Sequence, residues 1–416
     1  MSGKFLNAFS QSKTTFFRRA WPLILLLLGD LILFRAIFQG EVLFFGDNLS
    51  LRLPNAIYAA QRIRAGELPL WNPYIFNGIP FLADISTGVF YPLNALFLFL
   101  DPFWALTALT MASVWIAGVG MYWLCRSMRL SQTGSTAGAF VFAFSATILH
   151  YTTYLNLLSS SIWMPFTLAS YMRFDRAGSR RWLLVSGLFL TLQILGGHPQ
   201  PVFYTILLLV AFSLFYPGKV RLRTRVGFVL PLLVALGFCA VVLLPAFELS
   251  RLSTRVRLDF AGATRDSLHP LLLLRLILPN LFDEPRVGMT WGPAWRQVAG
   301  NNGYAGIVSL LLLLIALGNY SGWPKSLRRW FTFFLGIGAF SVFISLGKYS
   351  SSSLYFIRFF LRFDCYEVRQ KHCSLPTLPS RPSRDLQCTC YSNEYRRRCV
   401  RRVLFSLRFS VLSVPA

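Results

Sequence analysis

Residues 227–248 read GFVLPLLVALGFCAVVLLPAFE, an apolar run whose single charged side chain is the last one, Glu248. A helix needs about 20 residues to cross about 30 Å of hydrocarbon, so this run is long enough to span a membrane. It lacks the alternation of apolar and polar residues that a strand of a membrane barrel shows. Because only helices and closed barrels satisfy every backbone group in lipid, the run predicts a transmembrane helix.

The rest of the 416-residue chain has the same character. Hydrophobic residues make up 55% of it and charged residues 14%, and the mean hydropathy is +0.52, which is too apolar for a soluble domain of this length. We therefore expect an all-α integral membrane protein, a polytopic helix bundle. Its apolar runs predict about nine transmembrane spans, near residues 21–38, 103–124, 134–151, 157–173, 182–197, 200–216, 227–248, 303–319 and 330–347.

Basic residues are distributed unevenly between these spans. The short loops near 152–156 and 198–199 contain no Lys or Arg, whereas the alternate segments are basic. This asymmetry follows the positive-inside rule and predicts a cytoplasmic N-terminal segment, residues 1–20, in a multi-pass membrane protein. The net charge of +25 is thus explained by orientation, so we expect membrane lipids and no nucleic acid as partners. The predicted inner segments hold Lys4, Lys13, Arg18, Arg19, Arg126, Arg129, Arg173, Arg176, Arg180, Arg181, Lys219, Arg221, Arg223, Arg225, Lys325, Arg328 and Arg329.

The predicted membrane domain, residues 21–364, has two long outer loops at about 39–102 and 249–302. Long translocated loops are largely exempt from the charge rule. Most of the 16 acidic residues fall on this outer side, so carboxylate chemistry is expected there. They are Glu41, Asp47, Glu67, Asp84, Asp101, Glu248, Asp259, Asp266, Asp283 and Glu284.

Residues 365–416 form a basic tail that differs from the preceding chain. It holds five of the seven cysteines, Cys365, Cys373, Cys388, Cys390 and Cys399. Their spacing fits no standard zinc pattern and suggests no particular disulfide. Two interpretations remain open: an aberrant or disordered out-of-frame tail, or a genuine basic extension. In neither do we expect a functional site.

The first outer loop begins with a short predicted helix bracketed by Pro54 and Gly66, which we expect along the membrane surface. The stretch 67–92 that follows is dense in Pro, Gly, Trp, Asn and Tyr, which indicates an ordered loop with aromatic anchors. The helix would have two faces, with Leu53, Ile57 and Ala60 on the apolar one and Arg52, Gln61 and Arg64 on the polar one.

Several short elements of the chain occur in a characteristic order. They are Gly46-Asp47, Pro69–Pro73 (PLWNP), Gly78–Pro80 (GIP), Tyr91-Pro92, Gly196–Gln200 (GGHPQ), Glu248 and Gly303–Gly306 (GYAG). In this order they resemble the bacterial YfhO family of membrane proteins. The resemblance covers about residues 20–360 and then stops, whereas family members continue with more spans and usually a distal soluble region. We therefore expect a C-terminally truncated or frameshifted relative of this family.

The resemblance implies a glycosyltransferase-like protein of the bacterial inner membrane, with a GT-C type of membrane fold. Such enzymes take a sugar from a polyprenyl-phosphate carrier and transfer it on the outer face, here to an envelope polymer or glycoconjugate. The reaction needs a carboxylate that accepts the acceptor's proton or holds a metal, and polar groups that stabilise the departing phosphate. No nucleotide-binding motif is present, and a divalent metal is the one cofactor that this chemistry would accommodate; its ligands are unknown.

Asp47 is the first candidate for the catalytic carboxylate, because it lies just past the outer end of the first span. The alternative is a helix-capping or turn Asp, which Gly-Asp-Asn favours locally. Asp84 is the second candidate, and a solvated loop acid is its alternative.

Six further residues are candidates for substrate binding: His198, Glu248, Arg52, Trp71, Asn72 and Tyr91. His198 could hydrogen-bond a phosphate or sugar, although a structural histidine fits as well. Arg52 could bind a phosphate, and ordinary lipid contact is its alternative. The aromatic residues could stack on the sugar, but aromatic belts at membrane interfaces use the same residues.

Two other classes of function remain open. A transporter or lipid flippase would place ionisable groups near the bilayer midplane. Here Asp30 and Arg35 are the charges inside the first predicted span, five residues apart. A non-catalytic envelope assembly factor is the third class. The outer position of most acids favours the glycosyltransferase.

Overall fold

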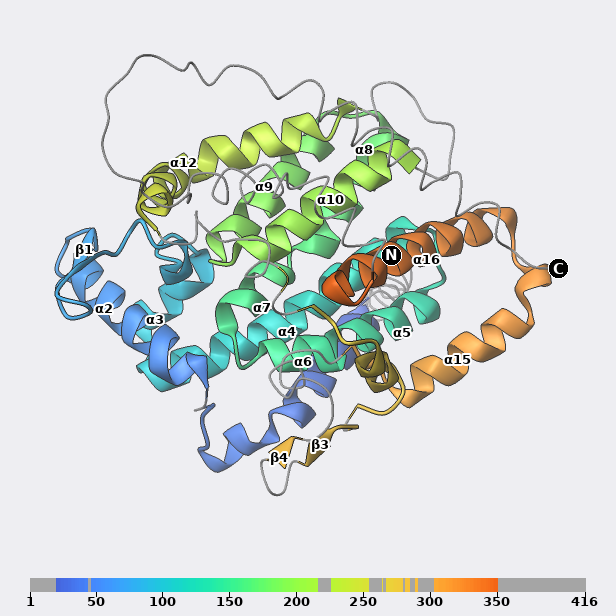
Figure 1. Ribbon diagram of the computed structural model, residues 1–416, viewed down its shortest axis with the longest axis horizontal. Coiled ribbons are helices and arrows are strands. Elements are labelled where there is room, and N and C mark those ends of the chain that lie inside the picture. Colours follow the sequence, from blue (N-terminus) through green and yellow to red (C-terminus); the bar gives the residue numbers. More distant parts are fainter. Residues whose placement is uncertain are drawn as a thin grey trace, which may run out of the picture. The chain divides into compact units, whose positions relative to one another are not determined.

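The computed structural model describes residues 20–43, 46–215, 226–253, 264, 267–279, 281–284, 289–290 and 303–350. The predicted tail 365–416 and all but the last residue of the predicted cytoplasmic segment lie outside these ranges. The described chain is mostly helical, and its sheet consists of two short antiparallel pairs (Figure 1). The predicted all-α class is therefore confirmed.

Three of the described helices are long and apolar enough to cross a membrane. They are α4 (Pro102–Ser127), α12 (Val229–Leu252) and α16 (Lys325–Ser345). Shorter apolar helices accompany them: Ala20–Leu33, α9 (Arg181–Leu195), α10 (Pro199–Phe215) and α15 (Ile307–Gly318). Large apolar side chains are exposed on several of these helices, for example Leu244, Phe247 and Ile315. Such surfaces are tolerated in lipid and costly in water, which suggests membrane association.

The stretch 157–173, predicted as one helix, is two helices in the structure. These are α7 (Leu155–Ser161) and α8 (Met164–Ala177). Pro165 explains the break, because it lacks an N–H and its ring clashes with the carbonyl four residues earlier, on Ser161.

The stretch 134–151 is also broken, into α5 (Gln132–Ala143) and α6 (Ala146–Tyr151). Ser145 lies at the break, where its Oγ accepts a hydrogen bond from the Ile148 N–H (3.3 Å) and starts the second helix. The Ala146 N–H leaves the helical ladder and donates to the carbonyl oxygen of Tyr304 (3.0 Å). The predicted first span likewise ends early, at Leu33, and continues as the 3₁₀ helix η1 (Arg35–Gln39).

The segment before α4 is built from short elements: η2 (Asn48–Arg52), α2 (Leu53–Arg64), β1 (Trp71–Asn72), β2 (Ile79–Pro80), η3 (Ile85–Thr87), η4 (Pro92–Ala95) and α3 (Leu96–Phe99). The predicted helix after Pro54 is confirmed, and its apolar positions Leu53 and Ala60 are buried. Arg52 departs from the expected polar face, because it is only 3% exposed.

The two-stranded hairpin pairs Trp71 with Pro80 and Asn72 with Ile79. Gly78 has φ +111°, and a Cβ at this position would lie 2.5 Å from the indole ring of Trp71. Glycine is therefore required both for the backbone conformation and for the close approach of the indole. The hairpin gives the predicted irregular stretch 67–92 a defined structure.

The remaining short elements follow α12. They are η6 (Pro270–Leu276), β3 (Asp283–Glu284) paired with β4 (Met289–Thr290), η7 (Tyr320–Gly322) and η8 (Gly347–Tyr349).

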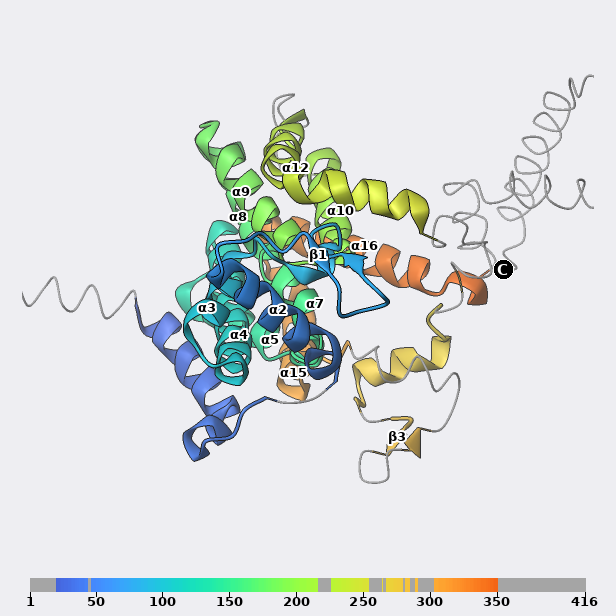
Figure 2. The same cartoon turned by 90° about the vertical axis from the view of Figure 1, so that its left-hand side faces the viewer.

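The helices after residue 101 pack in a connected series. Helix α4 packs against α5 and α8, and α9 packs against α8 and α12 (Figure 1, Figure 2). Many serine and threonine hydroxyls inside these helices donate hydrogen bonds to backbone carbonyl oxygens one turn earlier, as Ser113 Oγ does to Leu109 (2.7 Å). These bonds satisfy most of the hydroxyls that the apolar bundle buries.

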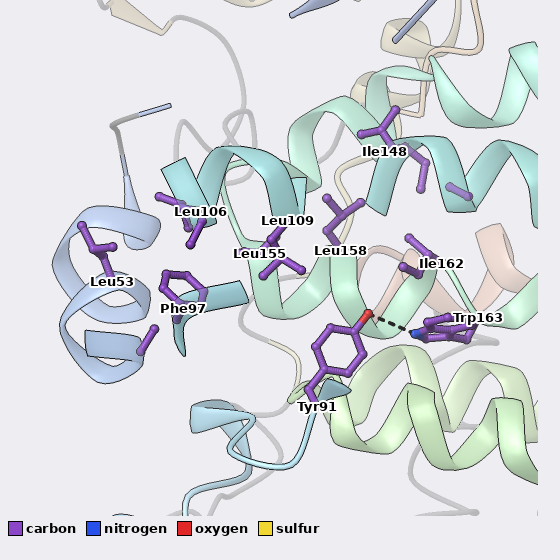
Figure 3. Close-up of a cluster of buried hydrophobic side chains, with 14 of the residues drawn as sticks. Leu53, Tyr91, Phe97, Leu106, Leu109, Ile148, Leu155, Leu158, Ile162 and Trp163 are labelled. Carbon is purple, nitrogen blue, oxygen red and sulfur yellow. Dashed lines mark hydrogen bonds between the residues drawn. The ribbon is translucent and has the colours of Figure 1, made fainter. Parts of the chain in front are cut away.

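A buried cluster joins the segment 46–101 to the helices (Figure 3). Leu106 and Leu109 of α4 meet Leu155 and Leu158 of α7, and Tyr91 packs beneath them. The indole Nε1 of Trp163 donates a hydrogen bond to the Tyr91 hydroxyl at 3.2 Å.

Aromatic rings continue from Trp163 through the bundle. Trp163 stacks on Phe189 with centroids 5.9 Å apart, and Phe166 lies 4.9 Å from Phe189. Trp123 contacts both phenyl rings and then Trp182, at 6.2 Å. These rings form an aromatic cluster that connects α4, α8 and α9, and its members are Trp163, Phe166, Phe189, Trp123 and Trp182.

Candidate functional site

A cavity of about 830 Å³ lies where the segment 46–101 meets the ends of α7, α9 and α12. We call it the Asp47–Asp84 cavity. Its walls come from segments far apart in the sequence: Asp47, Asn48, Leu51 and Arg52; Ala83, Asp84, Ile85 and Ser86; Tyr154, Leu155, Asn156 and Leu157; His198; and Ala246, Leu249, Ser250 and Ser253. Four predicted site residues, Asp47, Asp84, His198 and Arg52, therefore line one cavity.

Asp47 is exposed and lies directly before η2. Its carboxylate makes no capping hydrogen bond to that helix, so the capping role considered for this Asp is not supported. The neighbouring Asn48 is buried and anchors the turn: its Nδ2 donates to the Thr152 carbonyl oxygen (2.6 Å), and its Oδ1 accepts from the Leu155 N–H (3.0 Å). Asn48 thereby fixes the backbone that presents Asp47.

Asp84 is half-buried and caps η3. Its Oδ1 accepts a hydrogen bond from the Ser86 N–H at 2.9 Å, which orients the carboxylate. The Ser86 carbonyl oxygen in turn accepts a hydrogen bond from Asn156 Nδ2 (2.8 Å). The Oδ1 of Asn156 is buried and has no hydrogen-bond partner among the described residues. Asp84 is thus held by a turn that is itself tied to α7.

Arg52 is a buried residue of the cavity wall, and its guanidinium joins three parts of the chain by hydrogen bonds. Its Nη1 donates to the Thr87 carbonyl oxygen (2.8 Å), and its Nη2 donates to Asn94 Oδ1. Burial lowers the pKa of Arg52 to about 10, so the guanidinium remains charged at neutral pH. Because both terminal nitrogens are engaged, Arg52 holds the cavity wall together and does not present the free two-pronged donor that we predicted for a phosphate.

His198 reaches the cavity because two glycines let the chain pass close to α7 and η3. A Cβ at Gly196 would lie 2.7 Å from the Ser160 nitrogen, and Gly197 has φ +94°. The His198 N–H donates to Ser160 Oγ (2.9 Å). The ring Nδ1 accepts from the Gln200 N–H (3.3 Å), which leaves Nε2 to carry the proton of the neutral ring. Burial lowers the pKa of His198, so the neutral form prevails at pH 7.

Four predicted substrate-binding residues lie outside this cavity. Glu248 is exposed on α12, although its neighbours Ala246 and Leu249 line the wall. Trp71 covers Gly78 in the hairpin and is 53% exposed. Asn72 is buried and its Oδ1 accepts from the Tyr74 N–H (3.0 Å), while Tyr91 is buried against Trp163.

The described residues contain no group of three or more His, Cys, Asp and Glu side chains that could hold a metal ion.

In comparisons with known proteins, no protein-family model, curated protein or solved structure matches this chain. The resemblance to the YfhO family accordingly rests on the sequence elements alone.

Proposed function

We propose that the protein is a membrane glycosyltransferase of the YfhO-like, GT-C type, which transfers a sugar from a polyprenyl phosphate to an envelope acceptor. The observation that carries this proposal is the convergence of Asp47, Asp84 and His198 on one cavity from three separate segments. Two carboxylates and a neutral imidazole around a space of this size match the proton acceptor and the hydrogen-bond donors that sugar transfer requires.

We further propose nine transmembrane spans, a cytoplasmic N-terminus and a location in the bacterial inner membrane. All cavity segments fall in, or next to, the loops that the distribution of Lys and Arg predicts on the outer side. This agreement between charge distribution and cavity walls supports an extracytoplasmic site.

In the proposed reaction, Asp47 accepts the proton of the acceptor hydroxyl. The oxygen then attacks the anomeric carbon, and the bond from that carbon to the phosphate oxygen breaks. The polyprenyl phosphate departs with the bonding electron pair, and the Nε2–H of His198 donates a hydrogen bond to it. Asp84, oriented by the Ser86 N–H, accepts a hydrogen bond from a sugar hydroxyl.

The test is sugar transfer by the purified protein in proteoliposomes, with a panel of polyprenyl-phosphate hexoses and release of polyprenyl phosphate as the readout. We expect Asp47→Asn to lower turnover at least about 100-fold, which is the ordinary contribution of a general base. Glu41→Gln is the matched control, because Glu41 is an exposed acid of the same segment that does not line the cavity. Equal turnover in the Asp47→Asn variant and wild type would refute the assignment.

The same assay tests two other acids that the sequence analysis named as site residues, Glu248 on α12 and Asp84 directly before η3. Glu248→Gln should retain turnover because Glu248 is exposed and outside the cavity, whereas Asp84→Asn should lose it.

A transporter or flippase is the second candidate, and Asp30 is the observation that favours it. Asp30 is 2% exposed within the helix Ala20–Leu33, and its Oδ1 has no hydrogen-bond partner among the described residues. Ionisable groups at membrane depth often serve a transport pathway. Lipid scrambling or sugar uptake by wild-type proteoliposomes, abolished in Asp30→Asn and unaffected in Asp47→Asn, would establish this alternative.

A further inference from the structure

Arg173 lies in a corner formed by two indole rings, at the end of α9 opposite the cavity. Its Cζ atom is 4.8 Å from the ring centroid of Trp123 and 4.9 Å from that of Trp182. Helix α9 begins at Arg181 beside this corner and ends just before His198, a rise of about 22 Å. The two sites are therefore separate.

The guanidinium lies between the two indole rings, and cation–π contacts with both rings hold it in this position. Among the described residues, Arg173 has neither a hydrogen-bond acceptor nor a carboxylate partner. The side chain is half-buried, so its N–H donors remain accessible to a ligand.

The surroundings are strongly basic. Arg126 follows Trp123 by one helical turn, Arg176 follows Arg173 by one turn, and both are exposed, as is Arg180. The one acid in the sequence between Arg126 and Leu195 is Asp175. This excess of positive charge favours an anion at the corner.

Apolar surface suited to a lipid lies on the same helix as Trp182. Leu184 and Leu188 of α9 are 47% and 46% exposed, and they follow the indole within two turns. A ligand with a phosphate and acyl chains would use both the guanidinium and this surface, whereas a free phosphate would use only the former.

We propose that Arg173, Trp123 and Trp182 form a binding site for the phosphate of an anionic phospholipid headgroup. Arginine is the side chain best matched to phosphate, because its planar guanidinium can donate two parallel hydrogen bonds to two phosphate oxygens. This site is independent of the proposed sugar transfer, and its test does not depend on catalysis.

The test uses the full-length protein reconstituted in phosphatidylcholine nanodiscs with and without phosphatidylglycerol, followed by native mass spectrometry of the lipids that stay bound. We expect the wild type to retain phosphatidylglycerol and not phosphatidylcholine. Arg173→Gln should weaken this retention about tenfold, the effect of losing charged hydrogen bonds. Arg181→Gln is the matched control: it removes a charge from the same cluster, but Arg181 already donates to Ser179 Oγ (3.0 Å) and does not contact the rings.

Equal retention by the Arg173→Gln and Arg181→Gln variants would overturn the proposal. So would displacement of the lipid by an equal concentration of inorganic phosphate, which would indicate a site for a small anion. Should Arg173→Gln fail to fold, Trp182→Leu replaces it, because this change removes one face of the corner and leaves the guanidinium. Loss of phosphatidylglycerol in Trp182→Leu supports the site, and unchanged retention refutes it.

Discussion

The indole Nε1 of Trp163 donates a hydrogen bond to the phenolic oxygen of Tyr91 at 3.2 Å, across 72 residues of sequence (Figure 3). Tyr91 is 1% exposed and belongs to the segment 46–101, whereas Trp163 lies at the junction of α7 and α8. Burial raises the pKa of Tyr91 to about 12, so the hydroxyl stays protonated and can accept this bond. The contact ties the segment that carries Asp47 and Asp84 to the helices.

Removing the Tyr91 hydroxyl should destabilise the protein. Tyr91→Phe leaves the Trp163 N–H buried without its acceptor, and we expect the free energy of unfolding in mixed micelles to fall by about 2 kcal/mol. Tyr74→Phe is the control, because Tyr74 is 83% exposed and should change stability by less than about 0.5 kcal/mol. Equal effects of the two changes would show that the Tyr91–Trp163 bond contributes nothing net.

Arg52 should be irreplaceable by lysine. Arg52→Lys keeps the charge but loses the planar fork that joins Thr87 and Asn94, so we expect a loss of about 2 kcal/mol in the free energy of unfolding. Arg64→Lys is a close control, since Arg64 also donates to backbone carbonyls, those of Phe97 and Leu98, but is exposed. Its loss should stay below about 0.5 kcal/mol. Chemical unfolding titrations of both variants measure these losses in the free energy of unfolding. Equal losses would show that the buried hydrogen bonds of Arg52 are worth no more than the exposed ones of Arg64.

Gly196 should tolerate no side chain. The added Cβ of Gly196→Ala would lie 2.7 Å from the Ser160 nitrogen and 2.8 Å from the Ser159 carbonyl oxygen, so backbone must move. We expect a cost of about 2 kcal/mol in the free energy of unfolding and displacement of His198. Gly237→Ala on α12 meets nothing within 4 Å and should be neutral or stabilising by about 0.5 kcal/mol. A destabilised Gly237→Ala together with an unaffected Gly196→Ala would contradict this packing.

The protonation of His198 should make stability depend on pH. Burial lowers the pKa of this ring in the folded chain from its ordinary value of 6.5, so the unfolded chain binds more protons just below that pH. The contribution of neutral His198 to the free energy of unfolding is fully present above pH 6.5 and decreases as the pH falls below it. The free energy of unfolding, measured at a series of pH values for wild type and His198→Gln, should fall more steeply with decreasing pH in the wild type below pH 6.5. Above pH 6.5 the two curves of free energy against pH should run parallel. Parallel curves throughout would exclude the effect.

The sequence predicted several helices within a few residues, because their ends carry clear signals. Pro102 and Pro199 start α4 and α10 close to the predicted positions 103 and 200. The breaks inside 134–151 and 157–173 were missed because hydropathy is continuous through them. Pro165 was a usable signal for the second break, since proline ends a helix a few residues before itself.

The candidate residues of the cavity were easier to predict than the residues that support them. Asp47 and His198 were candidates because they lie next to the ends of predicted spans, and Asp84 because it lies in the same predicted loop as Asp47. Asn48 and Asn156 did not, because their partners lie far away in the sequence. The hydrogen bond from Asn48 to Thr152 joins residues 104 positions apart, and no local sequence pattern predicts it.

The walls of the Asp47–Asp84 cavity include residues as distant as Asp47 and Ser253. During synthesis the two carboxylates therefore leave the ribosome long before the last wall does. A nascent chain halted ahead of α12 would carry both acids with one side of their enclosure missing, so the site matures late in biogenesis.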